Sequence, residues 1–221
     1  MRTLVTCLAV LSAIGTGAQA GVTEAVVRKP YRVQGNSAAE VRADLKAKGP
    51  DGWDGYTYWH VDWRYVYKPA DAGCGIREVA TQLTITFTMP SLETDNSVLK
   101  AAFDDYLTRL QVHEDGHAEN GREAARRIDA GIAALTAATC EELGRVANAF
   151  GHRIVAETAA ADKTYDAATG HGRTQGAVFP KPLEVGSIGP QSPDIAEADA
   201  SSSCAAPAYE GNECSSSTTG F

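Results

Sequence analysis

The segment LQVHEDGHAENGREAARRI, residues 110–128, decides how the second half of the chain folds. Its apolar positions recur every three or four residues, which is the spacing that places side chains on one face of an α-helix. The same spacing extends in both directions and predicts a long helix from about Val98 to Leu135. His113 and His117 continue the apolar face, so we expect both imidazoles to point into the protein interior.

A second helix is predicted after a short turn near residues 136–139. Thr139 and Glu142 have the spacing of a capping box, in which each side chain satisfies a free backbone N–H at the start of a helix. An apolar stripe then continues to about Tyr165. We expect the two helices to pack as an antiparallel hairpin.

The first half of the chain has the two-residue period of β-strands. Apolar and polar residues alternate over 57–67 and 79–89, and a run rich in Val and Tyr at 22–33 indicates another strand. Pro90 is expected to end the strand before it. A short helix, opened by the capping box Ser37–Glu40 and ending near residues 49–50, separates the first two strands. The predicted fold class is α+β: a small, mostly antiparallel sheet packed with a long two-helix antiparallel hairpin.

The N-terminus has the features of a Sec-type signal peptide. Basic Arg2 precedes an apolar run over residues 4–14, and Ala18-Gln-Ala20 matches the small-x-small cleavage pattern. This run is too short to span a bilayer. We expect cleavage after Ala20 and a secreted or periplasmic protein. Residues 21–180 are then expected to form one domain with a sizeable core, and residues 181–221, rich in Pro, Ser, Gly, Ala and acidic residues, a disordered tail.

Four cysteines follow the predicted cleavage site. An even number in an oxidising compartment indicates two disulfides. Of the three possible pairings, the most economical is Cys74–Cys140 with Cys204–Cys214, because the last two lie within one short tail. A thiolate metal site is disfavoured, since the chain has no Cys-x-x-Cys spacing.

The charge of the chain argues against polyanionic partners. The formal net charge is −8, and loss of Arg2 with the signal peptide makes it −9. A net-acidic surface without a Lys/Arg cluster repels phosphate backbones. We therefore expect no nucleic-acid partner, and, since no second apolar stretch is long enough, no membrane span.

The sequence His113-Glu114-Asp-Gly-His117 predicts a zinc site. On a helix, histidines four residues apart point the same way and can share one Zn²⁺, while the glutamate is close enough to act as general base on the metal-bound water. A glycine in the middle of a helix costs about 1 kcal/mol relative to alanine, so Gly116 suggests that something approaches the backbone closely. The compact metzincin arrangement is disfavoured, because Asn120 and Glu123 stand where it needs a glycine and a third histidine.

A third zinc ligand is expected where the second helix returns to the level of His117. Counting through the turn places this level near residues 157–163. We favour His171, because imidazole is a good zinc ligand and the flanking glycines allow a close approach. Asp166 is an alternative, as a ligand or as a residue that orients one. Glu157 is the third candidate.

The sequence assigns other polar residues to the site less strongly. Tyr165 is either a hydrogen-bond donor to the oxyanion formed during hydrolysis or a buried residue that fills the end of the helix. Gln175 has the same ambiguity. His60 lies on the polar face of its strand and His152 lies off the buried stripe, so neither is assigned to the site.

Several motifs, taken together, resemble a known family over roughly residues 30–180. They are Thr57-x-Trp59 with Trp63 and Tyr65, Cys74-Gly-Ile, His113-Glu114-x-Gly116-His117, Cys140, and Tyr165-Asp166-x-x-Thr169-x-His171-Gly172-x-x-Gln175-Gly176. The family is the domain-of-unknown-function 922 family, described as predicted secreted zinc-dependent proteases. The resemblance implies that Asp166, His171 and Gln175 belong with the helical motif.

The sequence therefore predicts a secreted zinc metallopeptidase that acts on a peptide or protein substrate. His113, His117 and a third ligand hold the zinc, and Glu114 activates a water against the peptide carbonyl. The alternative is an exported metal-binding or cell-envelope interaction protein with a closed, non-catalytic site. An open coordination position beside a groove favours the enzyme, and four protein ligands favour the binding protein.

Overall fold

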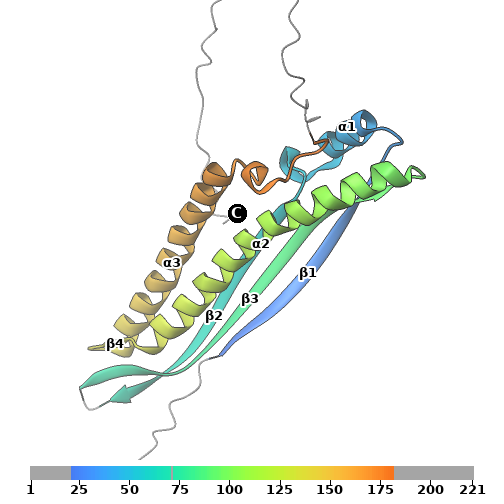
Figure 1. The fold of residues 1–221 in the computed structure, drawn as a ribbon. Helices are drawn as coiled ribbons and strands as arrows, with labels where there is room; N and C mark the ends of the chain where they lie inside the picture. The colour runs from blue at the N-terminus through green and yellow to red at the C-terminus, as the bar shows by residue number, and fades with distance from the viewer. Residues whose placement is uncertain (1–20, 71, 182–221) are drawn as a thin grey trace, which may run out of the picture.

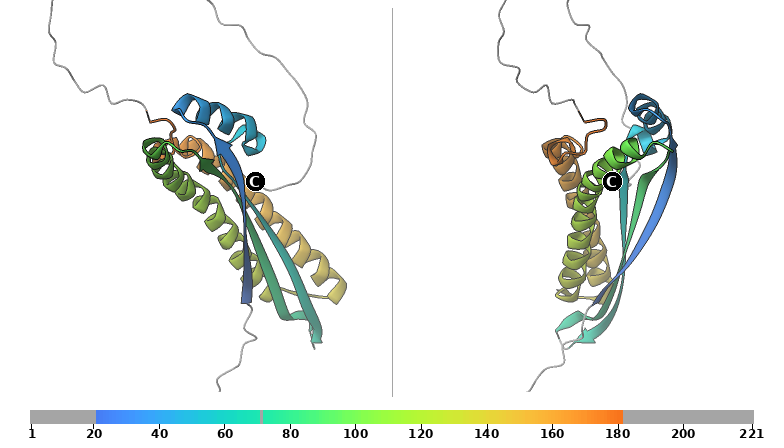
Figure 2. Two further views of the ribbon diagram at one scale, coloured as in Figure 1. Left: turned by 90° about the vertical axis from the view of Figure 1, so that its right-hand side faces the viewer. Right: turned by 45° about the vertical axis from the view of Figure 1, so that its right-hand side comes forward.

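A long twisted sheet and two long helices form the two layers of the molecule (Figures 1 and 2). The computed structural model describes residues 21–70 and 72–181; the predicted signal peptide and nearly all of the predicted tail, with Cys204 and Cys214, lie outside these ranges. The elements in chain order are β1 (Gly21–Gln34), α1 (Ala38–Lys48), β2 (Tyr56–Ala70), β3 (Gly73–Glu93), α2 (Ser97–Ala133), β4 (Thr136–Ala137) and α3 (Cys140–Thr169). Short 3-10 turns lie at Pro50–Gly52 and Arg173–Gln175.

The sheet is mixed. Its strand order is β1-β3-β2, and β4 pairs with the beginning of β3. β1 runs parallel to β3, while β2 and β4 run antiparallel to it. The α+β class is thus confirmed, but the expectation of a mostly antiparallel sheet is not. Alternation of apolar and polar residues shows which face of a strand is buried and is the same for either strand direction.

β3 is longer than the sequence predicted. It continues through Pro90 to Glu93, although Pro90 was expected to end it. The pairing of β2 with β3 stops at Thr88, so beyond that point β3 has only β1 beside it. A proline costs little where a strand has a neighbour on one side only, because a missing N–H on the free side breaks no ladder hydrogen bond.

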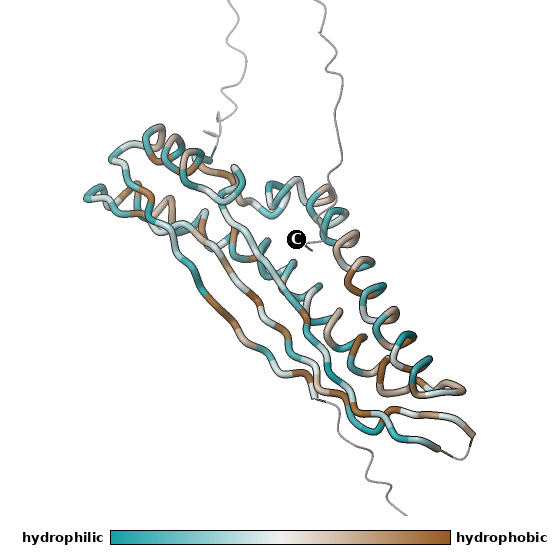
Figure 3. Tube along the Cα trace, turned by 180° about the vertical axis from the view of Figure 1, so that it is seen from behind, coloured by the Kyte–Doolittle hydropathy of each residue, from teal (hydrophilic) through white to brown (hydrophobic). Residues whose placement is uncertain are grey.

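The helices begin at the predicted caps. The Ser37 hydroxyl accepts a hydrogen bond from the Glu40 amide, and the Thr139 hydroxyl accepts one from the Glu142 amide. α2 and α3 run in opposite directions on the same side of the sheet (Figure 1). Apolar residues alternate along the strands beneath them (Figure 3).

Two apolar clusters form the core, and α2 contributes to both. The first lies between the sheet and the second half of α2, where Ile85 and Phe87 meet Ile128. The second surrounds α1 and the first half of α2, around Leu45 and Phe103. Along α2, Leu110 is the last residue of the second cluster and Ala118 is the first residue of the first cluster. The histidine motif occupies the interval between them.

A disulfide joins the beginning of β3 to the beginning of α3. Cys74 and Cys140 form it, as the predicted pairing requires, with their Cα atoms 5.0 Å apart and 66 positions between them in sequence. It therefore fixes the sheet to the helix layer at the end away from α1. Neither long helix in the described ranges is apolar enough over a sufficient length to cross a bilayer.

The disulfide is expected to contribute substantially to stability. Replacing both cysteines with alanine should lower the free energy of unfolding by about 4 kcal/mol, because a crosslink that closes a loop of this length restricts the unfolded chain. Chemical denaturation of the wild type and the double variant measures the difference. A reductant should destabilise the wild type and leave the variant unchanged; equal stability of the two proteins would contradict the prediction.

Candidate metal centre

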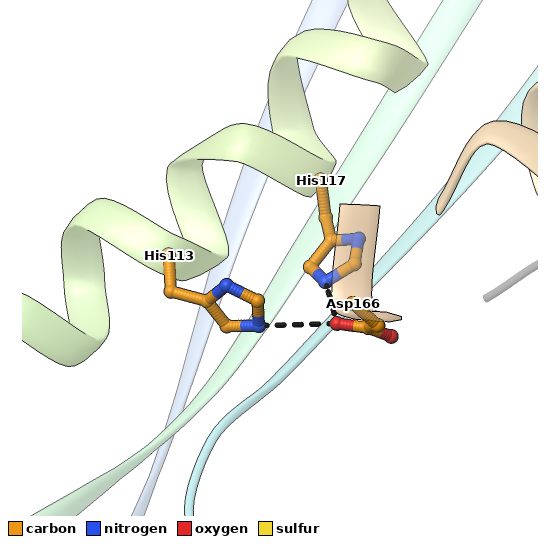
Figure 4. Close-up of side chains that lie close together, drawn as sticks. All are labelled: His113, His117 and Asp166. Atoms are coloured by element: carbon orange, nitrogen blue, oxygen red, sulfur yellow. Dashed lines mark hydrogen bonds and ion pairs between the residues drawn. The ribbon is translucent and has the colours of Figure 1, made fainter. Parts of the chain in front are cut away.

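Two histidines near the middle of α2 and one aspartate near the end of α3 lie close together (Figure 4). The Nε2 atoms of His113 and His117 lie 3.2 and 3.0 Å from the same oxygen, Oδ1 of Asp166. One donor atom from each of the three residues lies within 4.8 Å of the other two. Imidazole nitrogen and carboxylate oxygen are both ligands of Zn²⁺ and other first-row divalent cations. The group could therefore hold a metal ion.

Both imidazoles are buried, as the helical pattern predicted. His113 is 4% exposed and His117 is 6% exposed. Asp166 is more accessible, so the group is open on the aspartate side. Buried imidazoles need partners for both ring nitrogens.

Asp162 holds His117 from the side opposite Asp166. Its Oδ1 lies 2.9 Å from Nδ1 of His117, and the carboxylate is fully buried. Trp59 Nε1 and Asn120 Nδ2 each donate a hydrogen bond of 2.8 Å to this carboxylate. A carboxylate in this position fixes the tautomer and orientation of a ligand histidine, leaving Nε2 for the metal.

Gln175 holds His113 in the corresponding way. Its Oε1 lies 3.1 Å from Nδ1 of His113, and its Nε2 donates a 2.9 Å hydrogen bond to the Tyr165 hydroxyl. The Tyr165 hydroxyl in turn donates to the carbonyl of His113 at 3.2 Å. Both histidines thus have Nδ1 occupied by an oxygen acceptor and Nε2 directed at Asp166.

The two histidines differ in their pKa values. Burial, together with the nearby charge of His117, lowers the pKa of His113. Burial also acts to lower the pKa of His117, but the hydrogen bond and charge of Asp162 and the charge of Asp166 outweigh it, so that pKa is raised. In the absence of metal, the pair therefore favours a proton on His117.

Glu114 lies beside the group with an unusually basic carboxyl. It is 3% exposed, and burial raises its pKa to about 7 in spite of a 2.7 Å hydrogen bond from the Thr57 hydroxyl. Gly55 permits this position, because a Cβ there would lie 2.8 Å from Oε1 of Glu114. A carboxyl with a pKa near neutrality can both accept and donate a proton under physiological conditions.

Tyr165 explains the glycine of the motif. A Cβ at Gly116 would lie 2.2 Å from the Tyr165 hydroxyl oxygen, so only glycine allows α3 to approach this closely. The Tyr165 ring stacks on His113, with centroids 5.1 Å apart. Its hydroxyl is engaged by Gln175 and the His113 carbonyl, and Tyr165 does not line the cavity described below. These contacts match the packing alternative, and the oxyanion role stays a prediction.

His171 lies near the group but outside it. Its Nδ1 is 3.4 Å from Oδ1 of Asp166, and its side chain is 45% exposed. The residue has a left-handed backbone, with φ of 53°, and its ring stacks on Trp53 at 4.0 Å between centroids. The third member of the donor group is therefore Asp166, the predicted alternative, and not His171, the favoured candidate.

Glu157 was a third candidate ligand and lies on the surface. Its carboxylate forms ion pairs with Arg127 at 2.6 Å and Arg153 at 2.7 Å. The buried residues of α3 at this level are Ile154 and Thr158, so Glu157 lies beside the buried stripe and not on it. His60, beside Asp62, and His152, against Trp63, are also away from the group.

An open cavity of about 810 Å³ adjoins the donor group. His113, Glu114, His117 and Asp166 line one part of it. The segment 51–57, which leads into β2, also lines it. A molecule in the cavity would therefore reach both the candidate metal ligands and the Glu114 carboxyl.

Some residues of the site were not assigned by sequence reasoning. Asp162 lies in the range 157–163, where a ligand was expected, but was not chosen as one, and Asn120 was named only as a departure from another motif. Asp162 and Asp166 are four residues apart on α3, so they share a helix face in the way the two histidines do. This spacing could have indicated that Asp162 and Asp166 lie together at the site. Thr57 and Trp59 of β2 were singled out only through the family resemblance, which did not indicate their contacts with Glu114 and Asp162.

Comparison with known proteins gives one match. A family model described as "Bacterial protein of unknown function (DUF922)" matches residues 28–172, well over half of the chain. No curated protein and no solved structure matches. The matched range includes α2, α3 and all three residues of the donor group.

Proposed function

The chain belongs to the DUF922 family of bacterial proteins of unknown function, and we propose that it is a secreted or periplasmic zinc-dependent metallopeptidase. His113, His117 and Asp166 would hold the zinc, and Glu114 would act as general base. The observation that carries the proposal is the convergence of two buried Nε2 atoms on one carboxylate oxygen beside a buried glutamate and an open cavity. The disulfide supports an oxidising compartment.

The donor set suits zinc. Two imidazoles and one carboxylate are a common set of three protein ligands in catalytic zinc sites, which leave the fourth position for water or substrate. The Asp162 and Gln175 contacts to both Nδ1 atoms support ligation through Nε2.

Glu114 would move the proton of the reaction. A bound zinc supplies a Lewis acid for the peptide carbonyl and makes a bound water more acidic. The Glu114 carboxylate would take a proton from the attacking water and later pass it to the amide nitrogen that leaves. Its position supports this role, because the Glu114 carboxyl lines the same cavity as the three donor residues.

The competing proposal is an exported protein that binds metal without catalysis. Such a site is normally closed by four protein ligands. In residues 21–70 and 72–181 the donor group contains three side chains, and it borders a cavity. Both observations favour the enzyme.

Removal of the metal tests the proposal directly. The mature protein should contain close to one zinc per chain by elemental analysis and should cleave members of an unbiased peptide library analysed by mass spectrometry. A chelator should abolish cleavage, and one equivalent of Zn²⁺ should restore it. Zinc binding without cleavage of any peptide would favour the binding protein, and cleavage that persists in the chelated protein would exclude a metallopeptidase.

A further inference from the structure

The cavity extends from the donor group along α2. Tyr106, Leu110, Glu114 and His117 line it and follow one another at three- or four-residue spacing, so they form one row on the helix. This row spans roughly 16 Å at 1.5 Å per residue. The space is therefore long enough to take a side chain next to the reacting bond as well as the bond itself.

The part of the cavity beyond Glu114 has apolar walls. Leu110 and Phe179 belong to the same core cluster, and Ala177 packs against it. Val178 also lines this part. An uncharged wall of this kind favours an apolar side chain, because a charged one would lose its hydration without gaining a partner.

Two charged residues, Arg42 and Asp54, also line the cavity, but they leave its apolar part uncharged. Arg42 donates hydrogen bonds from both terminal nitrogens to the two carboxylate oxygens of Asp54, and the Tyr106 hydroxyl also donates to Asp54. The guanidinium and the carboxylate thus neutralise each other. Neither is free to recognise an oppositely charged group of a ligand.

Trp53 forms an aromatic wall that is held in place. Its indole lines the cavity, is 46% exposed and stacks on His171. Its amide donates a 2.8 Å hydrogen bond to the Pro50 carbonyl, and the Tyr31 hydroxyl donates a 2.6 Å hydrogen bond to the carbonyl of the next residue, Asp54. A large aromatic surface that is already ordered loses little entropy when it is covered by a ligand.

We infer that this part of the cavity is a subsite for a large apolar side chain, aromatic or of leucine size, next to the scissile peptide bond. Trp53 and Leu110 are its main contacts. The inference rests on the proposed function, because it assumes that the reacting bond lies at the donor group. It adds the substrate class: peptides with a bulky apolar residue at the cleavage position.

Binding of two small ligands tests the subsite without requiring cleavage. The probes are a pair of peptide hydroxamates that differ only in a benzyl or a methyl side chain beside the metal-binding group. Calorimetry on the zinc-loaded full-length mature protein should show the benzyl compound binding about 10-fold tighter or more, as expected when an apolar pocket is filled. Equal affinity, tighter binding of the methyl compound, or no binding of either would overturn the inference.

Variants then assign the preference to Trp53. Trp53→Ala should reduce the benzyl-to-methyl affinity ratio at least about 5-fold, whereas Trp53→Phe should keep most of it. Tyr67→Ala is the matched control, because Tyr67 is similarly exposed, at 47%, near the far end of β2. An unchanged ratio in Trp53→Ala would remove Trp53 from the subsite. If the benzyl preference is present but no library peptide is cleaved, the subsite stands and the peptidase proposal fails.

Discussion

Replacing Glu114 with glutamine should leave zinc bound and lower the rate of peptide cleavage by about 10²- to 10⁴-fold, the usual contribution of a general base. The amide has nearly the same shape as the carboxyl and can still accept the hydrogen bond from Thr57, so the fold should be kept. It cannot take a proton from water. The loss should therefore fall on kcat, with little change in KM.

Asp115→Asn is the matched control for this experiment. Asp115 is the next residue on α2, is exposed, and contacts only Gln111 among the described side-chain hydrogen bonds. The substitution makes the same chemical change outside the cavity and should retain full activity. Kinetics on a cleaved library peptide, with zinc content measured in parallel, compares the two variants. A Glu114→Gln protein with wild-type kcat would remove Glu114 from the reaction.

The second large effect is expected at Asp166. Replacing it with alanine should weaken zinc binding at least about 100-fold, because loss of a ligand should exceed the 10- to 100-fold cost of losing a residue that only orients one. His171→Ala should keep the zinc content of the wild type, since its ring lies outside the donor group and against Trp53. Competition with a chromophoric chelator measures both affinities.

Asp162→Asn provides an intermediate case. Its amide can still occupy the space beside His117, but it no longer favours the proton on Nδ1, so zinc affinity should fall 10- to 100-fold. Circular dichroism of each variant separates loss of ligation from loss of fold. If His171→Ala lost the zinc and Asp166→Ala kept it, the ligand set proposed for this chain would be wrong.

The helical part of the site could be predicted from sequence because its signal is local. His113, Glu114 and His117 lie within two helical turns, and the apolar residues around them show which way that face points. The caps at Ser37 and Thr139 are equally local, and both helices begin where predicted. For the same reason β1 and β2 could be located within a few residues, whereas β3 begins six residues before and ends four residues after the predicted range.

The third ligand was harder to predict because it depends on how two helices are aligned. Counting back through the turn indicated the correct region of α3. One residue more or less in the turn, however, rotates α3 by about 100° and changes which side chain faces the histidines. The glycines around His171 suggested a close approach to the metal. In the structure these glycines allow a sharp turn, with left-handed backbone at residues 170–172, that directs the His171 ring toward Trp53.

The direction of β1 could not be predicted for a different reason. A parallel and an antiparallel neighbour bury the same face of β3 and leave the same alternation in sequence. What decides between them is the path of the chain through α1 and β2. That path is a property of the whole first half of the molecule.

The parallel pairing of β1 with β3 has a consequence for the order in which the chain folds. Each β1 residue pairs with the residue 59 positions later, from Gly21 with Ala80 to Gln34 with Glu93. β2 ends at Ala70 and β3 begins at Gly73, so that pair can form as a hairpin with almost no loop to close. Contacts between distant parts of a chain slow folding, so we expect β2, β3, α2 and α3 to assemble first and β1 to join last. The strands and helices that carry the donor group and Thr57 would then be in place before the N-terminal edge of the sheet is complete.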